Sequence, residues 1–414
     1  MQEHFVPAAA WAAPFAALLL CIALLPLAAP AFWESNARKL GIALGLGLPV
    51  LLLYLRENPT ALLHAALDYV SFMVLLGSLF VISGGVLLEG DLQATPRVNA
   101  AFLGAGALLA SVVGTTGASM LLIRPLLQTN QERRHVAHTV VFFVFLVSNV
   151  GGALTPLGDP PLFLGYLAGV PFTWTLRLAP AWLLTVTVLL SIYMAWDTRA
   201  YGSERVEDLR RDVEDVRPLR VSGKGNCVLL FLVVLAVSAL KAPYREAAMI
   251  LLAAASFAFT PQEIRRANRF TAQPILEVAA LFAGIFLTML PALDLLRARG
   301  GHLGVREPWH YFWASGLLSS FLDNAPTYLT FLAMAQGQGL PNEVVGVSHR
   351  ILEALSLGSV FMGANSYIGN GPNFMVRSIA EERGVRMPSF GGYMVYSGAV
   401  LLPVFALVTL VFFR

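Results

Sequence analysis

The sequence predicts an all-α polytopic membrane protein built from two inverted repeats, and three observations lead to this fold class. Hydrophobic residues make up 57% of the chain, charged residues only 13%, and the mean hydropathy is +0.68. Long apolar segments are separated by short polar loops, and one long hydrophilic stretch, residues 197–225, divides them. Apolar segments interrupted by Gly and Pro recur at the same place in each half. This composition excludes a soluble fold, and no basic tract indicates binding to nucleic acid.

The first half, residues 1–196, contains six apolar segments that define its expected elements. Three of them are close to the ~20 residues that cross the hydrocarbon core of a bilayer, so each is expected to form one helix. The first also resembles a signal peptide, but Met1–Phe5 carries no Lys or Arg, and we expect the segment to remain as a spanning helix. The expected elements are scaffold helices within 14–88 (14–31, 39–55 and 67–88), a re-entrant helical hairpin at 99–127, a broken helix at 136–167 and a span at 178–196.

The second half, residues 226–414, repeats this plan after a charged linker. Residues 197–225 hold seven basic and seven acidic residues and are expected to form a solvated, partly helical connector in the cytoplasm. Five crossings per half is an odd number, so the second half is expected to be inverted, with about ten spans and two hairpins in all. The Lys and Arg residues that flank the segments number seventeen on the linker side and eight on the other, which places both termini outside the cytoplasm. The expected elements are scaffold helices within 226–293, a hairpin at 310–338, a broken helix at 343–377 and a span at 391–412.

The interruption of the helix at 136–167 is the most unusual stretch of the chain. Gly151–Pro161 carries two adjacent glycines, three prolines and Asp159 within an apolar run. Gly loosens a helix and Pro removes a backbone donor, so we expect unwound backbone here. Such backbone is tolerated at membrane depth only where it is buried in protein or lines a watery cavity. An ionisable residue in it is a functional candidate.

A matching motif follows 211 positions later, at Gly363–Asn373. The two hairpin tips also match each other, at an offset of 208 positions. The matched pairs are Thr155 and Ser366, Asp159 and Asn370, Thr115 and Asp323, and Thr116 and Asn324. Interrupted apolar segments at corresponding positions of two halves point to the binding site of a secondary transporter.

The interrupted segments carry two carboxylates, Asp159 and Asp323, which we expect to meet near the middle of the bilayer. Burial disfavours a charged carboxylate, so each is expected to bind either a proton or Na⁺. Na⁺ is a hard cation that prefers oxygen ligands, and hydroxyl and amide oxygens lie on the same elements. The candidate ligands besides the aspartates are Thr115, Thr116, Thr155, Asn324, Asn365, Ser366 and Asn370. Competition between Na⁺ and a proton for one site is sufficient for antiport.

Three stretches resemble the ion transporter superfamily: SNVGGALTPLGDPP at 148–161, SSFLDNAPTYLTF at 319–331 and GANSYIGNGPN at 363–373. The likeness is to its NhaD-type sodium/proton antiporters and its citrate-transport branch, and it covers the whole chain in segment order. It implies a homodimer in the bilayer and an elevator mechanism, in which each half gives a hairpin and a broken helix to a mobile transport domain. The dicarboxylate carriers of the superfamily have Ser-Asn-Thr at the hairpin tips, whereas the tips here read Gly-Thr-Thr-Gly and Leu-Asp-Asn-Ala.

Several candidates have a second interpretation. Asp159 is alternatively the partner of Arg124 or Arg350 in a structural ion pair. Either arginine is alternatively a ligand of a substrate carboxylate. Asp323 is alternatively a cap for the free backbone donors of the hairpin tip.

The remaining polar residues of the apolar segments have less specific roles. Asn373 and Thr327 complete the motifs, either as helix caps or as ligands. His138 and His349 are expected to pack or to reach the membrane interface rather than to relay protons. Secondary candidates for proton carriers are Glu277 and Glu353.

The sequence therefore predicts a secondary active transporter and not an enzyme. Two acids in the site favour sodium/proton antiport, and the alternative is ion-coupled uptake of citrate or a dicarboxylate. No cofactor is expected besides Na⁺ or H⁺ as the coupling ion. The expected location is the inner membrane of a bacterium.

Overall fold

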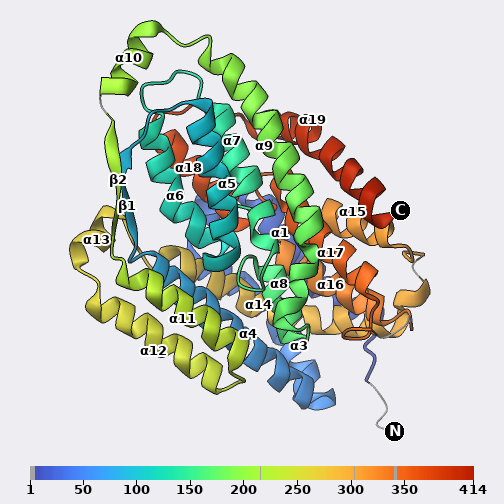
Figure 1. The fold of residues 1–414 in the computed structure, drawn as a ribbon. Coiled ribbons are helices and arrows are strands. Elements are labelled where there is room, and N and C mark those ends of the chain that lie inside the picture. The colour runs from blue at the N-terminus through green and yellow to red at the C-terminus, as the bar shows by residue number, and fades with distance from the viewer. Residues whose placement is uncertain (1–4, 215, 303, 340–342) are drawn as a thin grey trace.

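The computed structural model describes residues 5–214, 216–302, 304–339 and 343–414, and nearly all of its regular structure is helical (Figure 1). Seven segments of these residues are helices long and apolar enough to cross a membrane. They are Ala9–Pro26, Asn36–Glu57, Pro59–Ser83, Pro96–Val113, Phe172–Tyr201, Gln273–Arg299 and Phe390–Phe413. The prediction of an all-α polytopic membrane protein is confirmed at this level.

Capping side chains and prolines set the starts of several helices in the first half. Asn58 accepts a hydrogen bond from the backbone N–H of Ala61 at 3.2 Å, and Pro59 follows it where a missing N–H costs nothing. Thr95 and Pro96 begin α5 in the same way. The elements are η1 (Ala9–Ala12), α1 (Ala13–Ala28), α2 (Pro30–Trp33), α3 (Asn36–Glu57), α4 (Pro59–Ser83), β1 (Leu87–Asp91), α5 (Pro96–Val113), α6 (Thr115–Thr129), α7 (Ala137–Leu146), η2 (Val150–Ala153), α8 (Pro160–Leu167), η3 (Phe172–Leu178) and α9 (Ala179–Tyr201).

In the second half, each apolar segment expected from the sequence also contains a helix. The two segments expected to be broken, in this half and in the first, are each divided into two α-helices with a short 3₁₀ turn between them. The elements are α10 (Val206–Glu214), β2 (Arg217–Ser222), α11 (Gly225–Ala239), α12 (Tyr244–Phe259), α13 (Gln262–Ala267), α14 (Gln273–Arg299), η4 (Gly300–His302), α15 (Pro308–Ser319), α16 (Asn324–Gln336), α17 (His349–Phe361), η5 (Met362–Asn365), α18 (Gly371–Glu382), α19 (Phe390–Val408) and η6 (Thr409–Phe413).

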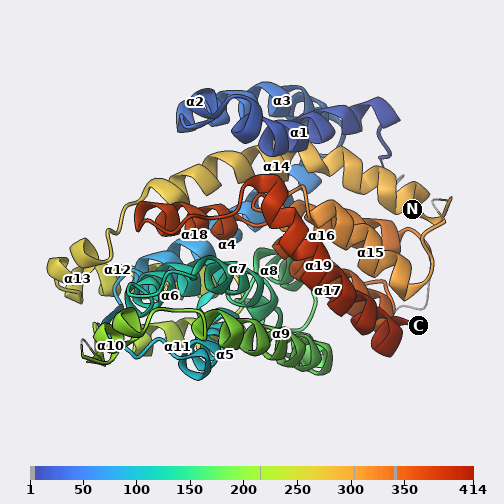
Figure 2. The ribbon, with the colours of Figure 1, turned by 90° about the horizontal axis from the view of Figure 1, so that it is seen from above.

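The helices form layers, which Figure 2 shows from above. Helices α1, α2 and α3 make an outer layer that packs on the long helix α14. On its other side, α14 contacts α4 and α16. Helix α4 also packs against α12 and touches α6 and α8, so α4 and α14 border the helices that carry the interrupted segments.

The first halves of the two broken helices, α7 and α17, form the centre of the molecule. Every residue of α7 from Val140 to Leu146 is fully buried, as are Leu352 and Leu355 of α17. A helix that is apolar on all sides is stable only when other helices surround it. Helices α5 and α15, from the segments predicted to form hairpins, provide much of this cover, α5 against η2 and α15 against α17. The interruptions that follow α7 and α17 are therefore held inside protein.

The linker contains helix α10, in line with a partly helical connector, and also a strand that was not predicted. β2 pairs antiparallel with β1, with Leu87 opposite Ser222 and Leu88 opposite Val221. The linker is also attached to the bundle by buried carboxylates. Asp212 accepts a hydrogen bond from the backbone N–H of Ala94 at 3.0 Å. A solvated connector was predicted because charged residues dominate this stretch, and charge alone does not reveal such pairing.

Candidate functional site

The interruption between α7 and α8 is held by a close approach of two glycines. A Cβ atom on Gly158 would lie 2.1 Å from the carbonyl oxygen of Gly152. Any other residue at position 158 would therefore force the backbone to move. The second motif repeats this feature, since a Cβ atom on Gly369 would lie 2.6 Å from the carbonyl oxygen of Gly363. The glycine pairs Gly152 and Gly158, and Gly363 and Gly369, thus permit a compact turn in both interruptions.

Two hydroxyls at matched positions fasten these turns to the hairpins. Thr155 Oγ1 donates to the carbonyl of Ser111 at 2.5 Å, and Ser366 Oγ donates to the carbonyl of Ser320. Each hydroxyl also accepts a hydrogen bond from the backbone N–H two residues later. Thr155 and Ser366, both candidate ligands, therefore hold the backbone in this structure.

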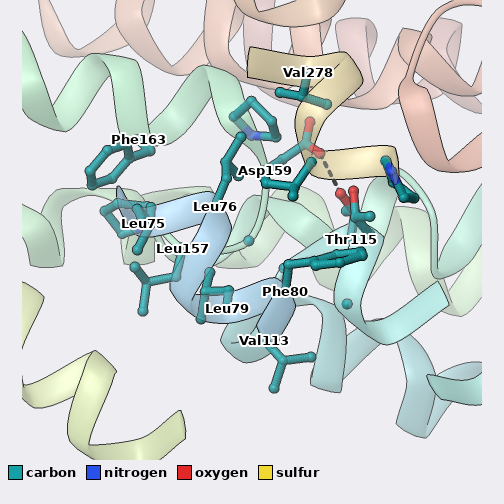
Figure 3. Close-up of a pocket in the computed structure, with 18 residues that line it drawn as sticks. Leu75, Leu76, Leu79, Phe80, Val113, Thr115, Leu157, Asp159, Phe163 and Val278 are labelled. Carbon is teal, nitrogen blue, oxygen red and sulfur yellow. Dashed lines mark hydrogen bonds between the residues drawn. The ribbon is translucent and has the colours of Figure 1, made fainter. Parts of the chain in front are cut away.

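Asp159 is the point at which the interrupted elements meet. It is 1% exposed and stands directly before α8. Its Oδ1 accepts a hydrogen bond from Thr115 Oγ1 at 2.7 Å (Figure 3). The same oxygen accepts one from Asn370 Nδ2 at 3.1 Å, and Oδ2 accepts one from Asn324 Nδ2. The three donors come from the first hairpin tip, the second interruption and the second hairpin tip. All three are neutral, so the carboxylate is hydrogen-bonded but has no cationic partner among the lining residues.

Asp323 caps the start of α16, which is one of the two roles considered for it from the sequence. Its Oδ1 accepts a hydrogen bond from the backbone N–H of Ala325 at 3.0 Å at the start of α16. Its neighbour in the chain, Asn324, donates to the Asp159 carboxylate, so the two acids belong to the same site. Next to it, Asn324 Oδ1 is buried and accepts no hydrogen bond among the described residues, and the same is true of Asn365 Oδ1. Because the Nδ2 of Asn324 donates to Asp159, the unused Oδ1 of the same amide lies beside that carboxylate.

A group of buried amides continues from Asp159 into the core. Asn370 Nδ2 also donates to the carbonyl of Ser148 at 3.0 Å, and Asn149 Nδ2 donates to Asn373 Oδ1 at 2.7 Å. Asn373 in turn donates to the carbonyl of Gly363 at 2.8 Å. Asn149 was not among the predicted residues. The sequence feature that could have identified Asn149 is its position two residues before Gly151, in an otherwise apolar run.

A pocket with a volume of about 70 Å³ adjoins Asp159, which leaves room for a few water molecules or one small hydrated ion. The first hairpin tip and the first interruption form one side of it, and α4 and α14 form the other (Figure 3). None of its lining residues is Lys, Arg or His. The lining residues are Leu75, Leu76, Leu79, Phe80, Val113, Gly114, Thr115, Thr116, Gly117, Pro156, Leu157, Gly158, Asp159, Pro160, Phe163, Pro274, Ile275 and Val278.

The two candidate arginines, Arg124 and Arg350, do not line this pocket. Arg350 donates to the backbone carbonyls of Phe412 at 3.4 Å and Arg414 at 3.2 Å, at the end of the chain. Arg124 lies half-buried in α6 and is not one of the lining residues. Among the described residues, neither arginine forms an ion pair with Asp159, so the structural ion pair considered from the sequence is not present.

The histidines and the secondary acids are engaged elsewhere. His138 Nε2 lies 2.9 Å from Asp197, and His349 Nδ1 accepts a hydrogen bond from Trp174 at 2.8 Å. Thr327 Oγ1 bonds to the carbonyl of Asp323 in its own helix. The secondary acids are in ion pairs, Glu277 with Lys39 at 2.5 Å and Glu353 with Arg177 at 2.8 Å.

Comparison with known proteins fits this architecture. Residues 4–413 match the pattern of a family described as "Putative citrate transport". The chain belongs to this family. It is also similar to an uncharacterized transporter of Mycobacterium tuberculosis, with 29% identity over 304 residues that cover 67% of each chain. A 46 kDa membrane protein of Mycobacterium leprae is 28% identical over 297 residues, which cover 64% of this chain and 65% of that protein. The citrate-transport family and these relatives make the protein an integral membrane transporter.

Proposed function

We propose that the protein is a secondary active transporter that exchanges Na⁺ for protons at Asp159. The observation that carries this proposal is the setting of the Asp159 carboxylate. Three neutral donors surround it, and the pocket beside it has no basic side chain. A buried carboxylate without a cationic partner is unstable in its charged form unless a cation joins it. A proton or a small metal cation satisfies this need equally, and binding of one displaces the other.

Oxygen atoms that can bind Na⁺ surround Asp159. Asp159 supplies a carboxylate, and Asn324 Oδ1 is a buried acceptor without a donor. The carbonyl of Gly158 faces the tip of the first hairpin, where it accepts the N–H of Thr115 at 2.8 Å. A hard monovalent cation is well suited to such a set of carboxylate, amide and carbonyl oxygens. Asp323 adds a second negative charge to the site and thereby strengthens its attraction for cations.

The movement that we propose is of the elevator type. In this scheme the two hairpins, α5–α6 and α15–α16, are re-entrant and travel with the broken helices, in two inverted repeats. Helices α4 and α14, which form the opposite side of the pocket, belong to a stationary scaffold that dimerises. Support comes from the resemblance to the ion transporter superfamily and from the matched hydrogen bonds of Thr155 and Ser366. We propose that the protein lies in the inner membrane of a bacterium, with both termini outside the cytoplasm.

Ion-coupled transport of citrate or a dicarboxylate is the second candidate, and the description of the family favours it. A polyanion would need cationic side chains or several bound cations to offset Asp159 and Asp323. Arg350 would have to leave the carbonyls near the C-terminus to reach them. The absence of basic residues from the pocket lining therefore favours cation/proton exchange.

The deciding experiment uses proteoliposomes that contain the purified protein and a pH-sensitive dye in an acidic lumen. Na⁺, Li⁺, K⁺ and then citrate are added outside in turn. Alkalinisation of the lumen by Na⁺ or Li⁺ alone is the expected result. A response that requires citrate would replace the antiport proposal with carboxylate transport.

A further inference from the structure

Asp68, in the membrane-spanning helix α4, is an acid outside the site around Asp159. Asp68 is half-buried, and it has no ion-pair partner among the described residues, although the charges of His64 and Arg245 act on it. His64 precedes Asp68 by one turn on the same helix face. An acid within a spanning helix is costly, and one without a partner calls for a functional account.

The nearby arginine is already neutralised by another acid. Arg245 Nε donates to Glu246 Oε1 at 2.8 Å, and both residues are at least nine-tenths buried. Ser71 Oγ donates to the same carboxylate oxygen at 2.8 Å, which joins α12 to α4 one turn beyond Asp68. The other oxygen, Glu246 Oε2, is buried and accepts no hydrogen bond among the described residues.

His64, Asp68, Ser71, Arg245 and Glu246 are called the Asp68 cluster below. The cluster holds two carboxylates and one permanent cation, so it carries an excess negative charge while His64 is neutral. The acidic residues of the adjoining helix α14 do not change this balance. Glu277 pairs with Lys39 at 2.5 Å, and Asp294 accepts a hydrogen bond from Tyr54 at 2.7 Å. An uncompensated carboxylate with an unused acceptor beside it favours the uptake of a positive charge.

One aromatic layer separates the Asp68 cluster from the pocket. Phe163 of α8 lines the pocket, and its ring lies 6.0 Å from the Arg245 guanidinium carbon and 6.4 Å from the ring of Phe72. Phe72 in turn stacks on Phe282 at 4.7 Å. Figure 3 shows Phe163 beside Leu75, on the α4 side of the pocket.

The spacing along α4 agrees with this arrangement. Asp68, Phe72, Leu75 and Leu79 fall on one face of the helix, at intervals of three or four residues. A rise of about 1.5 Å per residue places Asp68 about 10 to 16 Å along α4 from the pocket wall. Since Phe163 follows Asp159 by four residues, a movement of α8 relative to α4 carries Asp159 and the aromatic ring together past α4.

We propose that the Asp68 cluster is a second proton-binding site, which exchanges its proton with Asp159 when α8 moves and Phe163 leaves the path. In this step the proton leaves the carboxyl group of Asp159 for water that enters the path, and the last water of that chain gives a proton to the carboxylate of Asp68, or the reverse. Each water gains one O–H bond and loses another, so the water is unchanged. A proton suits the cluster better than a metal ion, because it needs no set of oxygen ligands. The exchange step rests on the proposed function, whereas proton binding by Asp68 does not.

The binding site is tested by infrared spectroscopy of the purified full-length protein, titrated between about pH 4 and about pH 9. The C=O stretch of a protonated carboxyl group reports each buried acid that titrates. We expect Asp68→Asn to remove one titrating band that Asp159→Asn retains, and Asp68→Glu to restore a band. Glu353→Gln is the matched control, because Glu353 is an intramembrane acid with an arginine partner, and it should leave the Asp68 band intact. A spectrum of Asp68→Asn that titrates like that of the wild type would overturn the proposal.

The exchange step is tested with the same variants in proteoliposomes. Asp68→Asn should slow Na⁺/H⁺ exchange at least about tenfold while Na⁺ still protects the purified protein against heat. Asp68→Glu should recover most of the rate. An unchanged rate in Asp68→Asn would overturn the transfer from Asp159 even if the infrared band disappears. A wild-type protein without exchange would refute the proposed function, and the infrared titration would still decide on Asp68.

Discussion

Asn370 and Asp159 occupy equivalent positions in two motifs that are 211 residues apart, and they are hydrogen-bonded to each other, Asn370 Nδ2 to Asp159 Oδ1, at 3.1 Å. One motif therefore brings an acid to the junction, and the other brings an amide that donates to it. At the hairpin tips the distribution is opposite, since Thr115 of the first tip matches Asp323 of the second. The two motifs therefore match in sequence position and in the hydrogen bonds of Thr155 and Ser366, but they differ in where the acids lie.

Replacement of Asp159 is expected to abolish exchange and preserve the fold. Asp159→Asn keeps the size of the side chain and an acceptor for Thr115, but it binds neither a proton nor a metal cation tightly. Dye-loaded proteoliposomes should show exchange at the level of empty liposomes, and gel filtration should show an unchanged elution volume. Exchange at the wild-type rate would remove Asp159 from the mechanism.

Replacement of Asp323 separates its two interpretations. Asp323→Asn retains an oxygen that accepts the N–H of Ala325, so the cap survives with a loss of stability below about 1 kcal/mol. If the negative charge is needed for cation binding, the concentration of Na⁺ at half-maximal exchange should rise by about tenfold or more. A variant with unchanged Na⁺ dependence would show that Asp323 acts as a cap only.

A carboxylate in place of Asn370 should be poorly tolerated. Asn370→Asp would place a second acid 3.1 Å from Asp159 and would face the carbonyl of Ser148 with an acceptor. Repulsion and the lost donor together should destabilise the protein by on the order of 3 kcal/mol near neutral pH. Thermal unfolding in detergent measures this effect, which should decrease as the pH is lowered and the two acids share a proton. A pH-independent melting difference would contradict this account.

The glycine turn offers a direct test of the close backbone approach. Gly158→Ala should destabilise the protein by more than about 3 kcal/mol or prevent its insertion, because its Cβ would lie 2.1 Å from the Gly152 carbonyl oxygen. Gly371→Ala is the control, since no atom lies within 4 Å of its added Cβ. Expression level and melting temperature of the two variants provide the comparison. Equal stability would show that the turn can relax.

The attachment of the linker should depend on pH through Glu204. Burial opposes its ionisation, but hydrogen bonds from the backbone N–H groups of His135 and Arg134 outweigh this and lower the pKa of Glu204. A lowered folded-state pKa means that the stabilisation is present above the unfolded value of about 4.3 and is lost as the pH falls through the folded value. Limited proteolysis of the linker should therefore accelerate on acidification below that range. Glu204→Gln should show a weaker pH dependence.

Much of the helical plan could be predicted from the sequence because apolar length and Gly-Pro interruptions are local signals. The residues around Asp159 could be proposed because Thr115, Asn324 and Asn370 stand at matched positions in the interrupted segments. Asn149 could not be ranked above other polar residues, since its role depends on a contact with Asn373, 224 residues away. The position of Arg350 beside the end of the chain is likewise a matter of tertiary packing.

The pairing of β2 with β1 had no comparable signal. Arg217–Val221 is exposed along its whole length, so no alternation of buried and exposed residues marks it as a strand. Asp68 was passed over because it stands in an ordinary apolar helix without a Gly or Pro interruption. Its importance follows only from the way Glu246 occupies Arg245 in a different helix.

The side of the pocket opposite Asp159 consists of hydrocarbon, with Leu75, Leu79 and Val278 as its main surface. None of these side chains has a polar atom to which a passing carboxylate could attach. A movement of Asp159 along these side chains breaks no hydrogen bond or ion pair with them. In the proposed elevator movement, the activation barrier then lies in removing water from the carboxyl group, and a neutral loaded carboxyl group crosses more readily than a bare anion. If the protein works by the proposed elevator mechanism, this apolar wall discriminates between loaded and empty states without a dedicated gate.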